Sequence, residues 1–200
     1  MTYRPSPNPS APTMLSFLWL GIAAVAYLAG NMAERFAWAF QLVCILGVVV
    51  SLYLLLRWRM TWFVYAVVPR GEGMAWEEEP ALAGGGLLRR MPPDGLDFVV
   101  VKGQGAKNGV MECVLGMDDL AEAWEVSRKA GNADETCPVY SRKAILERYP
   151  GAKVYEYIQT YGWERAVAAV FRDGQGYAVL LLDLPAESEM GRYLLGMGNQ

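Results

Sequence analysis

The sequence predicts a membrane-spanning helical hairpin followed by a soluble α+β domain, and three observations predict it. Two runs, residues 14–33 and 36–56, contain no charged side chain. Each run matches the roughly 20 helical residues that cross a bilayer core about 30 Å thick. Beyond them the chain has the composition of a globular protein, with strand-like segments and a final amphipathic one. We therefore expect a hairpin over residues 14–57 and a soluble domain over residues 60–200.

The first 13 residues are expected to form a disordered tail. Proline stands at positions 5, 7, 9 and 12, and proline disfavours helix and favours extended chain. A recognition peptide is the alternative use of such a segment.

The two uncharged runs are expected to pack as antiparallel neighbours, because the connection between them is short. Backbone polar groups must pair internally in lipid, so each run should be a helix. Small residues stand four apart in both runs, at Ala26 and Gly30 and at Gly47 and Ser51. This spacing lets helix backbones approach closely, either within the hairpin or between two copies of the chain.

The basic residues near the ends of the runs predict the orientation. Arg57, Arg59 and Arg70 follow the second run, and such residues are enriched on the cytoplasmic side of a membrane. Both termini are therefore expected to be cytoplasmic, in a protein of the cell membrane that crosses twice. A signal peptide is the alternative for the first run, but only Arg4 precedes it as a basic residue.

Strand-like segments open the soluble domain. Residues 61–68 are rich in β-branched and aromatic side chains and end at Pro69. They follow the second run so closely that the domain should lie directly against the lipid headgroups. Residues 96–102 and 109–115 are predicted to pair as a β-hairpin.

Two glycine-rich segments are expected to be loops. Residues 103–108 resemble a phosphate-binding loop only loosely, because no helix follows, and a hairpin loop is the preferred interpretation. Residues 71–93 contain an acidic triplet and three consecutive glycines. They are expected to be a long loop, with residues 87–90 as a short strand candidate within it.

Two helices are expected next. Residues 117–130 place Leu120, Ala123 and Trp124 on one helical face, after acidic residues that can cap the start. Residues 141–149 form a second, shorter candidate.

The last third of the chain is predicted to be β-rich and to end in a helix. Residues 153–161 alternate and put Tyr155, Tyr157 and Tyr161 on one face. Residues 165–172 and 177–183 should form a hairpin. The residues after Pro185 start a helix whose apolar stripe must be covered, and that stripe consists of Met190, Tyr193, Leu194 and Met197.

This order of elements resembles bacterial membrane proteins that carry a pleckstrin-homology-like (PH-like) domain behind an N-terminal helical hairpin. It is also similar to a group of uncharacterised proteins from anaerobic Gram-positive bacteria. The local matches are residues 98–105, residues 153–158 and the Asp173-Gly174 hairpin with its following helix. The resemblance implies an antiparallel sheet or barrel closed by a C-terminal amphipathic helix, with a helical insertion at 117–149 that departs from the simplest form. It implies no catalytic residues.

Composition excludes several classes of function. The chain has no histidine and three scattered cysteines, which removes imidazole-based triads and argues against zinc and against a disulfide framework. The part from Arg57 onward has 16 basic and 20 acidic residues, a balance unlike that of nucleic-acid-binding proteins. An enzyme would have to use Glu112, Glu156, Asp183 and the face that carries Tyr155, Tyr157 and Tyr161. We expect no enzyme activity and no bound cofactor.

The predicted function is that of a non-catalytic binding module for lipid headgroups or for a protein whose identity the sequence does not give. An accessory subunit that docks through the hairpin is the alternative. If lipid is the ligand, its phosphate is expected to contact arginines, because guanidinium groups bind phosphate through paired hydrogen bonds. The same arginines also fit positive membrane flanks and surface loops. The candidate contacts are Arg57, Arg59, Arg70, Arg89 and Arg90.

Overall fold

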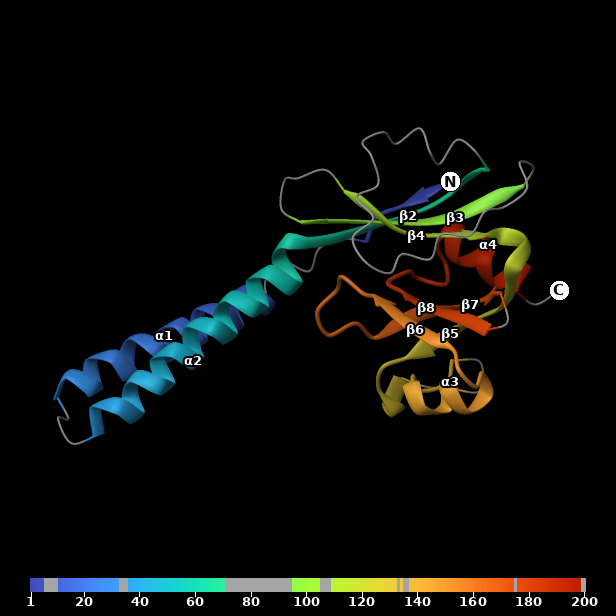
Figure 1. The fold of residues 1–200 in the computed structure, drawn as a ribbon. Coiled ribbons are helices and arrows are strands. Elements are labelled where there is room, and N and C mark those ends of the chain that lie inside the picture. Colours follow the sequence, from blue (N-terminus) through green and yellow to red (C-terminus); the bar gives the residue numbers. More distant parts are fainter. Residues whose placement is uncertain are drawn as a thin grey trace.

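The computed structural model describes residues 1–5, 11–32, 36–70, 95–104, 109–132, 134, 137–174 and 176–198. It consists of a long helical hairpin and, beside one end of it, two sheets with two helices (Figure 1). The predicted combination of two apolar helices with an α+β part is confirmed.

The hairpin is formed by α1 (Ala11–Met32) and α2 (Ala37–Leu54), and α2 continues into a π-helical turn, η2 (Leu55–Met60). Both helices are long and apolar enough to cross a membrane, and most of their side chains are exposed. The small residues serve packing within the hairpin: a Cβ on Gly47 would lie 3.0 Å from the Trp19 carbonyl oxygen and from Ala23 Cβ. A buried hydrogen bond of 2.6 Å between the hydroxyls of Ser16 and Ser51 joins the helices.

The first sheet is antiparallel, with strand order β1-β2-β3-β4. Its short outer strand contradicts the expected disordered tail, because the amino group of Met1 donates to the Val67 carbonyl oxygen and Thr2–Tyr3 pair with β2. Residues 6–10 of that tail lie outside the described residues. The strands are β1 (Thr2–Tyr3), β2 (Thr61–Pro69), β3 (Leu96–Gln104) and β4 (Val110–Gly116).

The second sheet has strand order β5-β7-β8-β6. Its edge strand β6 runs parallel to β8, whereas β5, β7 and β8 pair antiparallel. The fold is therefore two open four-stranded sheets in the described part of the chain, and the expected closure into a barrel is wrong. The strands are β5 (Leu120–Ser127), β6 (Lys153–Tyr157), β7 (Arg165–Asp173) and β8 (Gly176–Leu182).

The main core lies between the two sheets. Phe98 of β3 stacks on Phe171 of β7 with ring centroids 5.8 Å apart, and both rings are fully buried. The helix α4 (Glu189–Met197) adds Met190 and Leu194 to this core, so its predicted apolar stripe is covered as expected. The helix α3 (Arg142–Arg148) lies on the outer face of the second sheet (Figure 1).

The helix predicted over residues 117–130 is wrong, because this segment forms a 3₁₀ turn, η4 (Met117–Asp119), followed by strand β5. Ala123 faces the main core, while Trp124 and Val126 pack on the outer face near α3. A strand covered on both faces loses the alternation that would reveal it. Its pairing with β7, about 40 residues later, then overrides the helical spacing.

The other predicted elements can be compared with the structure directly. The strand at 61–68 and both β-hairpins are present, and Ser141 caps the helix predicted at 141–149 through its side chain. The strand predicted at 153–161 ends earlier, at Tyr157. The loop at 71–93 lies outside the described residues, as does its strand candidate at 87–90.

Strand directions divide the soluble part into a near end, next to the hairpin, and a far end. The near end contains the start of β2, the end of β3 and the start of β4. The end of β5, the end of β6 and the start of β7 lie on the same side, since Ser127 pairs with Arg165 and Arg57 contacts Ile158. In Figure 1 the orange loop after β6 reaches toward the base of the hairpin.

Candidate functional site

The five arginines expected to contact lipid do not form one site. Arg57 precedes β2 and Arg70 follows it, so a nine-residue strand separates them, which is about 30 Å at 3.3 Å per residue. Arg89 and Arg90 lie outside the described residues, as does the side chain of Arg59.

Arg70 belongs to an ion-pair cluster at the far end. Its Nε atom lies 2.9 Å from Asp97 Oδ1, and its Nη2 atom lies 3.1 Å from Asp118 Oδ2. Only 7% of the Arg70 side chain is exposed, and the Asp97 side chain is nearly as buried. Its charge is balanced within the protein by carboxylates from the start of β3 and from η4.

Arg57 instead connects the end of the hairpin to the second sheet. Its Nη2 donates to the Ile158 carbonyl oxygen at 3.1 Å, and its guanidinium lies over the Trp58 ring, 4.5 Å from the centroid. The Nη1 atom is buried and has no hydrogen-bond partner among the described residues. Trp58 in turn meets Tyr161 edge to face, with centroids 5.4 Å apart. The end of the hairpin is therefore fixed to the loop after β6.

Trp62, the second residue of β2, occupies a notch formed by two glycines. A Cβ on Gly103 would lie 2.0 Å from the Trp62 ring, and a Cβ on Gly109 would lie 2.7 Å from it. The guanidinium of Arg4 lies over the same ring, 5.1 Å from the centroid. Gly103 has no positive φ, so this glycine provides space for the ring rather than turn geometry.

A basic turn follows β5 beside the loop after β6. The Arg128 amide donates to the Glu164 carbonyl oxygen at 2.9 Å, and the Arg128 guanidinium lies next to Gly162, 3.9 Å from where its Cβ would be. Arg128 and Lys129 are both exposed. We name the near-end set of cations and rings the junction collar; it consists of Arg4, Arg57, Trp58, Trp62, Arg128, Lys129 and Tyr161.

A buried polar network lies next to the junction collar. The Asp183 carboxylate accepts the amides of Gln159 at 3.1 Å and Thr160 at 2.6 Å. The Tyr65 hydroxyl donates to the Tyr157 carbonyl oxygen and accepts the Asp183 amide at 3.1 Å. Burial, together with the Asp183 charge, raises the pKa of Tyr65 well above its ordinary value. This network joins β2 of the first sheet to the near ends of β6 and β8.

The residues considered for catalysis are not brought together. Glu112 pairs with Lys102 at 2.8 Å, Glu156 accepts the Tyr140 hydroxyl at 2.9 Å, and Asp183 caps backbone amides. Tyr157 is buried in the main core, with Tyr155 stacked on it. No group of three potential metal ligands occurs among the described residues.

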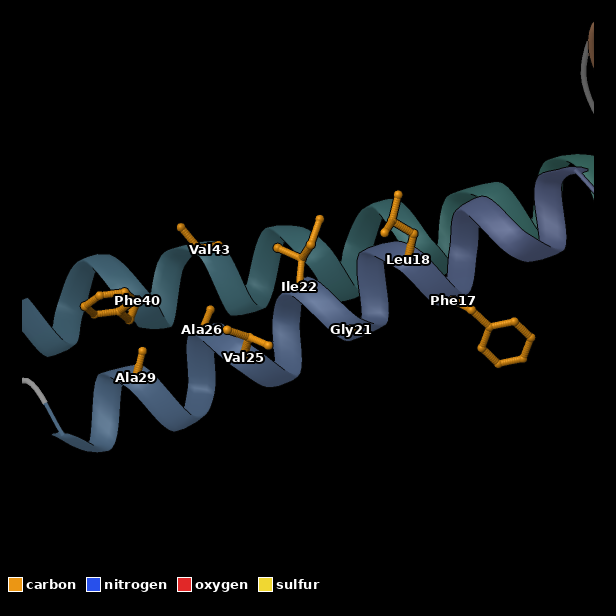
Figure 2. Close-up of a pocket in the computed structure, with 9 residues that line it drawn as sticks. All are labelled: Phe17, Leu18, Gly21, Ile22, Val25, Ala26, Ala29, Phe40 and Val43. Atoms are coloured by element: carbon orange, nitrogen blue, oxygen red, sulfur yellow. The ribbon is translucent and has the colours of Figure 1, made fainter.

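A surface depression lies on the hairpin, and Figure 2 shows the residues that line it. It is an apolar groove of about 620 Å³. Nothing lies within 4 Å of a Cβ placed on Gly21, so this glycine leaves the groove open. The groove has no polar lining that could orient a reactive group; its residues are Phe17, Leu18, Gly21, Ile22, Val25, Ala26, Ala29, Phe40 and Val43.

Comparison with protein-family models, with curated proteins and with solved structures finds no match for this chain. The collar therefore has to be interpreted from its own geometry. Sequence reasoning gave Arg57 but missed Arg128 and Lys129. These two residues lay inside the helix wrongly predicted at 117–130, and no local pattern connected them to residues 161 and 162.

Proposed function

We propose that this protein is a membrane-anchored, non-catalytic binding module. The hairpin spans the bilayer, and the two-sheet domain, which we propose to be PH-like, lies directly against the headgroups. The observation that carries the proposal is the absence of any linker: β2 begins at Thr61, directly after η2. The hydrogen bond from Arg57 to Ile158 then holds the second sheet against the same helix end.

The proposed orientation places the soluble domain in the cytoplasm. Arg57 and Arg59 end the second helix, and Arg4 precedes the first, so basic residues gather at the same end of both helices. Such residues are retained on the cytoplasmic side. A cleaved signal peptide fits poorly with this arrangement, because Met1 and Thr2–Tyr3 pair with β2 and the first helix packs against the second.

An accessory subunit of a larger membrane complex is the second candidate. The groove on the hairpin favours this role, because the open space at Gly21 accommodates the side chains of another membrane helix. Extraction in a mild detergent followed by size measurement separates the two candidates. A complex with other chains supports the accessory role, and a monomer supports the self-contained module.

Membrane extraction tests the anchoring itself. Vesicles that carry the full chain are washed with alkaline carbonate and, in parallel, with urea at neutral pH. Retention of the intact chain in the pellet after both washes is the expected result. Release into the supernatant by neutral urea overturns the proposal. Protease added to sealed inverted vesicles should then digest the soluble domain and leave a hairpin-sized fragment, whereas full protection would reverse the orientation.

A further inference from the structure

Charge is divided between the two ends of the soluble domain. At the near end, Arg4, Arg57, Arg128 and Lys129 form no ion pair among the described residues. The only exposed carboxylate on the loop after β6 is that of Glu164, which also forms no ion pair in the described part. At the far end, Arg70 is neutralised by Asp97 and Asp118. A domain whose overall charge is negative therefore has, at the end next to the hairpin, four basic side chains without an ion pair among the described residues.

The other carboxylates near the basic turn are already occupied. Glu125 lies 3.4 Å from Arg165, and Asp134 lies 3.9 Å from the same guanidinium. Arg165 therefore pairs with both acids that face this turn from β5 and from the segment after it, and its single positive charge balances one of the two. Arg128 and Lys129 form no ion pair among the described residues, so both side chains can contact a ligand.

The collar also has side chains of the type that contact phosphate. The Arg128 guanidinium is exposed and lies beside Gly162, 3.9 Å from where a Cβ on that glycine would be. Guanidinium groups bind phosphate through paired hydrogen bonds. Trp58, Tyr161 and Trp62 place aromatic rings among these cations, and tryptophan and tyrosine are the residues enriched at the headgroup level of membranes.

We propose that the junction collar binds the phosphate groups of anionic lipids in the leaflet that the hairpin enters, through the exposed side chains of Arg128 and Lys129, with the exposed Arg4 at the same end of the domain. This inference rests on the proposed membrane anchoring and names the ligand of the near end. A lipid is favoured over a protein because β2 starts directly at the helix end, which leaves little room for a folded partner between the domain and the bilayer.

Lipid retention on the purified full chain tests the proposal. The chain is held in micelles of a neutral detergent and titrated with phosphatidylglycerol or phosphatidylcholine, and bound lipid is counted by native mass spectrometry. The test variant is Arg128→Gln with Lys129→Gln. The matched control is Arg142→Gln with Lys143→Gln, the same exposed pair of residue types on α3. Thermal unfolding of both variants checks that the fold is intact.

The original chain is expected to retain phosphatidylglycerol in preference to phosphatidylcholine. Each basic residue near a membrane surface contributes about 1 kcal/mol, which is about fivefold in affinity, so the test variant should bind phosphatidylglycerol about 25-fold more weakly. The control should bind it as the original chain does. Equal retention by test variant and original chain, or an equal loss in test variant and control, overturns the proposal.

Two further measurements distinguish a lipid ligand from a free anion and from a protein. Inorganic phosphate at millimolar concentration should leave lipid retention unchanged; full displacement would indicate a site for free anions and would overturn the lipid assignment. A polypeptide that co-purifies with the original chain and is lost from the test variant, with lipid retention unchanged, would assign the collar to a protein. Neutral urea washing of vesicles carrying the same variants reports on anchoring alone, so failure of lipid binding is distinguished from failure of the proposed function.

Discussion

The arginines at the two ends of strand β2 lie in opposite environments. Arg70, at the far end, is buried and held by Asp97 and Asp118. Arg57, at the near end, stacks on Trp58 and hydrogen-bonds to a backbone carbonyl but forms no ion pair in the described part of the chain. The charge of the arginine at the far end is thus paired within the protein. At the near end, cations and aromatic rings lie beside the hairpin, and Arg57 has no ion pair among the described residues.

This difference shows that a basic residue close to a membrane segment in sequence is not evidence of a membrane contact. The carboxylates that reach Arg70 come from the start of β3 and from η4, both distant in the chain. The near end acquires its basic turn from the end of β5, which is equally distant from the hairpin. Strand register decides which cations remain without an ion pair, and four experiments test the difference between the two ends.

Alkaline pH is expected to have the largest effect, because it acts on a buried thiol and a buried phenol of the main core. Burial raises the pKa of the Cys113 thiol from 9.0 to about 12 and also raises that of the Tyr157 hydroxyl. The unfolded chain therefore releases these protons first. Their contribution to stability is fully present below about pH 9 and is lost as the pH rises toward 12. Several such groups together should unfold the two-sheet domain.

Near-ultraviolet circular dichroism of the full chain in micelles, from neutral pH to pH about 12, measures this loss. The far-ultraviolet helical signal of the hairpin should remain, because α1 and α2 are held in the micelle and contain no Asp, Glu, Lys or Arg side chain. A tertiary signal that stays constant across this range would contradict the burial of the thiol and the phenols.

Removal of the buried carboxylate should have the next largest effect. Asp183→Ala leaves the amides of Gln159 and Thr160 without an acceptor at the end of β6. The loss of two charge-assisted hydrogen bonds in a buried site should cost about 3 kcal/mol of unfolding free energy. Asp173→Ala, the same change at the far end of the β7–β8 hairpin, should cost less than about 0.5 kcal/mol. Urea unfolding of both variants makes the comparison, and equal losses would show that the Asp183 network is not structural.

Two glycine substitutions compare close packing at the near end with turn geometry at the far end. Gly103→Ala pushes a Cβ into the Trp62 ring and should cost about 2 to 3 kcal/mol. Gly174→Ala meets no neighbouring atom but must adopt a φ of +62°, which should cost about 1 kcal/mol. Thermal unfolding measures both losses. Trp62→Ala added to Gly103→Ala should remove most of the clash, and strictly additive losses would argue against the notch.

The parts of the fold that depend on local chemistry were predictable from sequence. Absence of charge identified the two helices, and turn residues identified the β7–β8 hairpin around Gly174. Strand β5 was missed because both of its faces are covered, so Leu120, Ala123 and Trp124 fit a helix equally well.

The candidate site was less predictable, because it depends on register between distant strands. Arg57 was found from its place beside the hairpin, but the neutralisation of Arg70 required knowing that Asp97 and Asp118 meet at one end of the sheets. Arg128 reaches the collar only because Ser127 pairs with Arg165. None of these contacts leaves a periodic signal in the chain.

The smallest expected effect lies in the hairpin just before the collar. Ser16 and Ser51 share a buried hydrogen bond close to the end at which α2 passes into η2. Ser16→Ala should destabilise the hairpin by about 0.6 kcal/mol, a typical value for a hydrogen bond between membrane helices. Ser51→Ala should cost about the same, and the double variant little more, because both changes remove one interaction. Thermal unfolding in micelles, followed by far-ultraviolet circular dichroism, measures the cycle. A double variant whose loss is the full sum of the single losses would mean that the two hydroxyls act separately and that no hydrogen bond between them stabilises the hairpin.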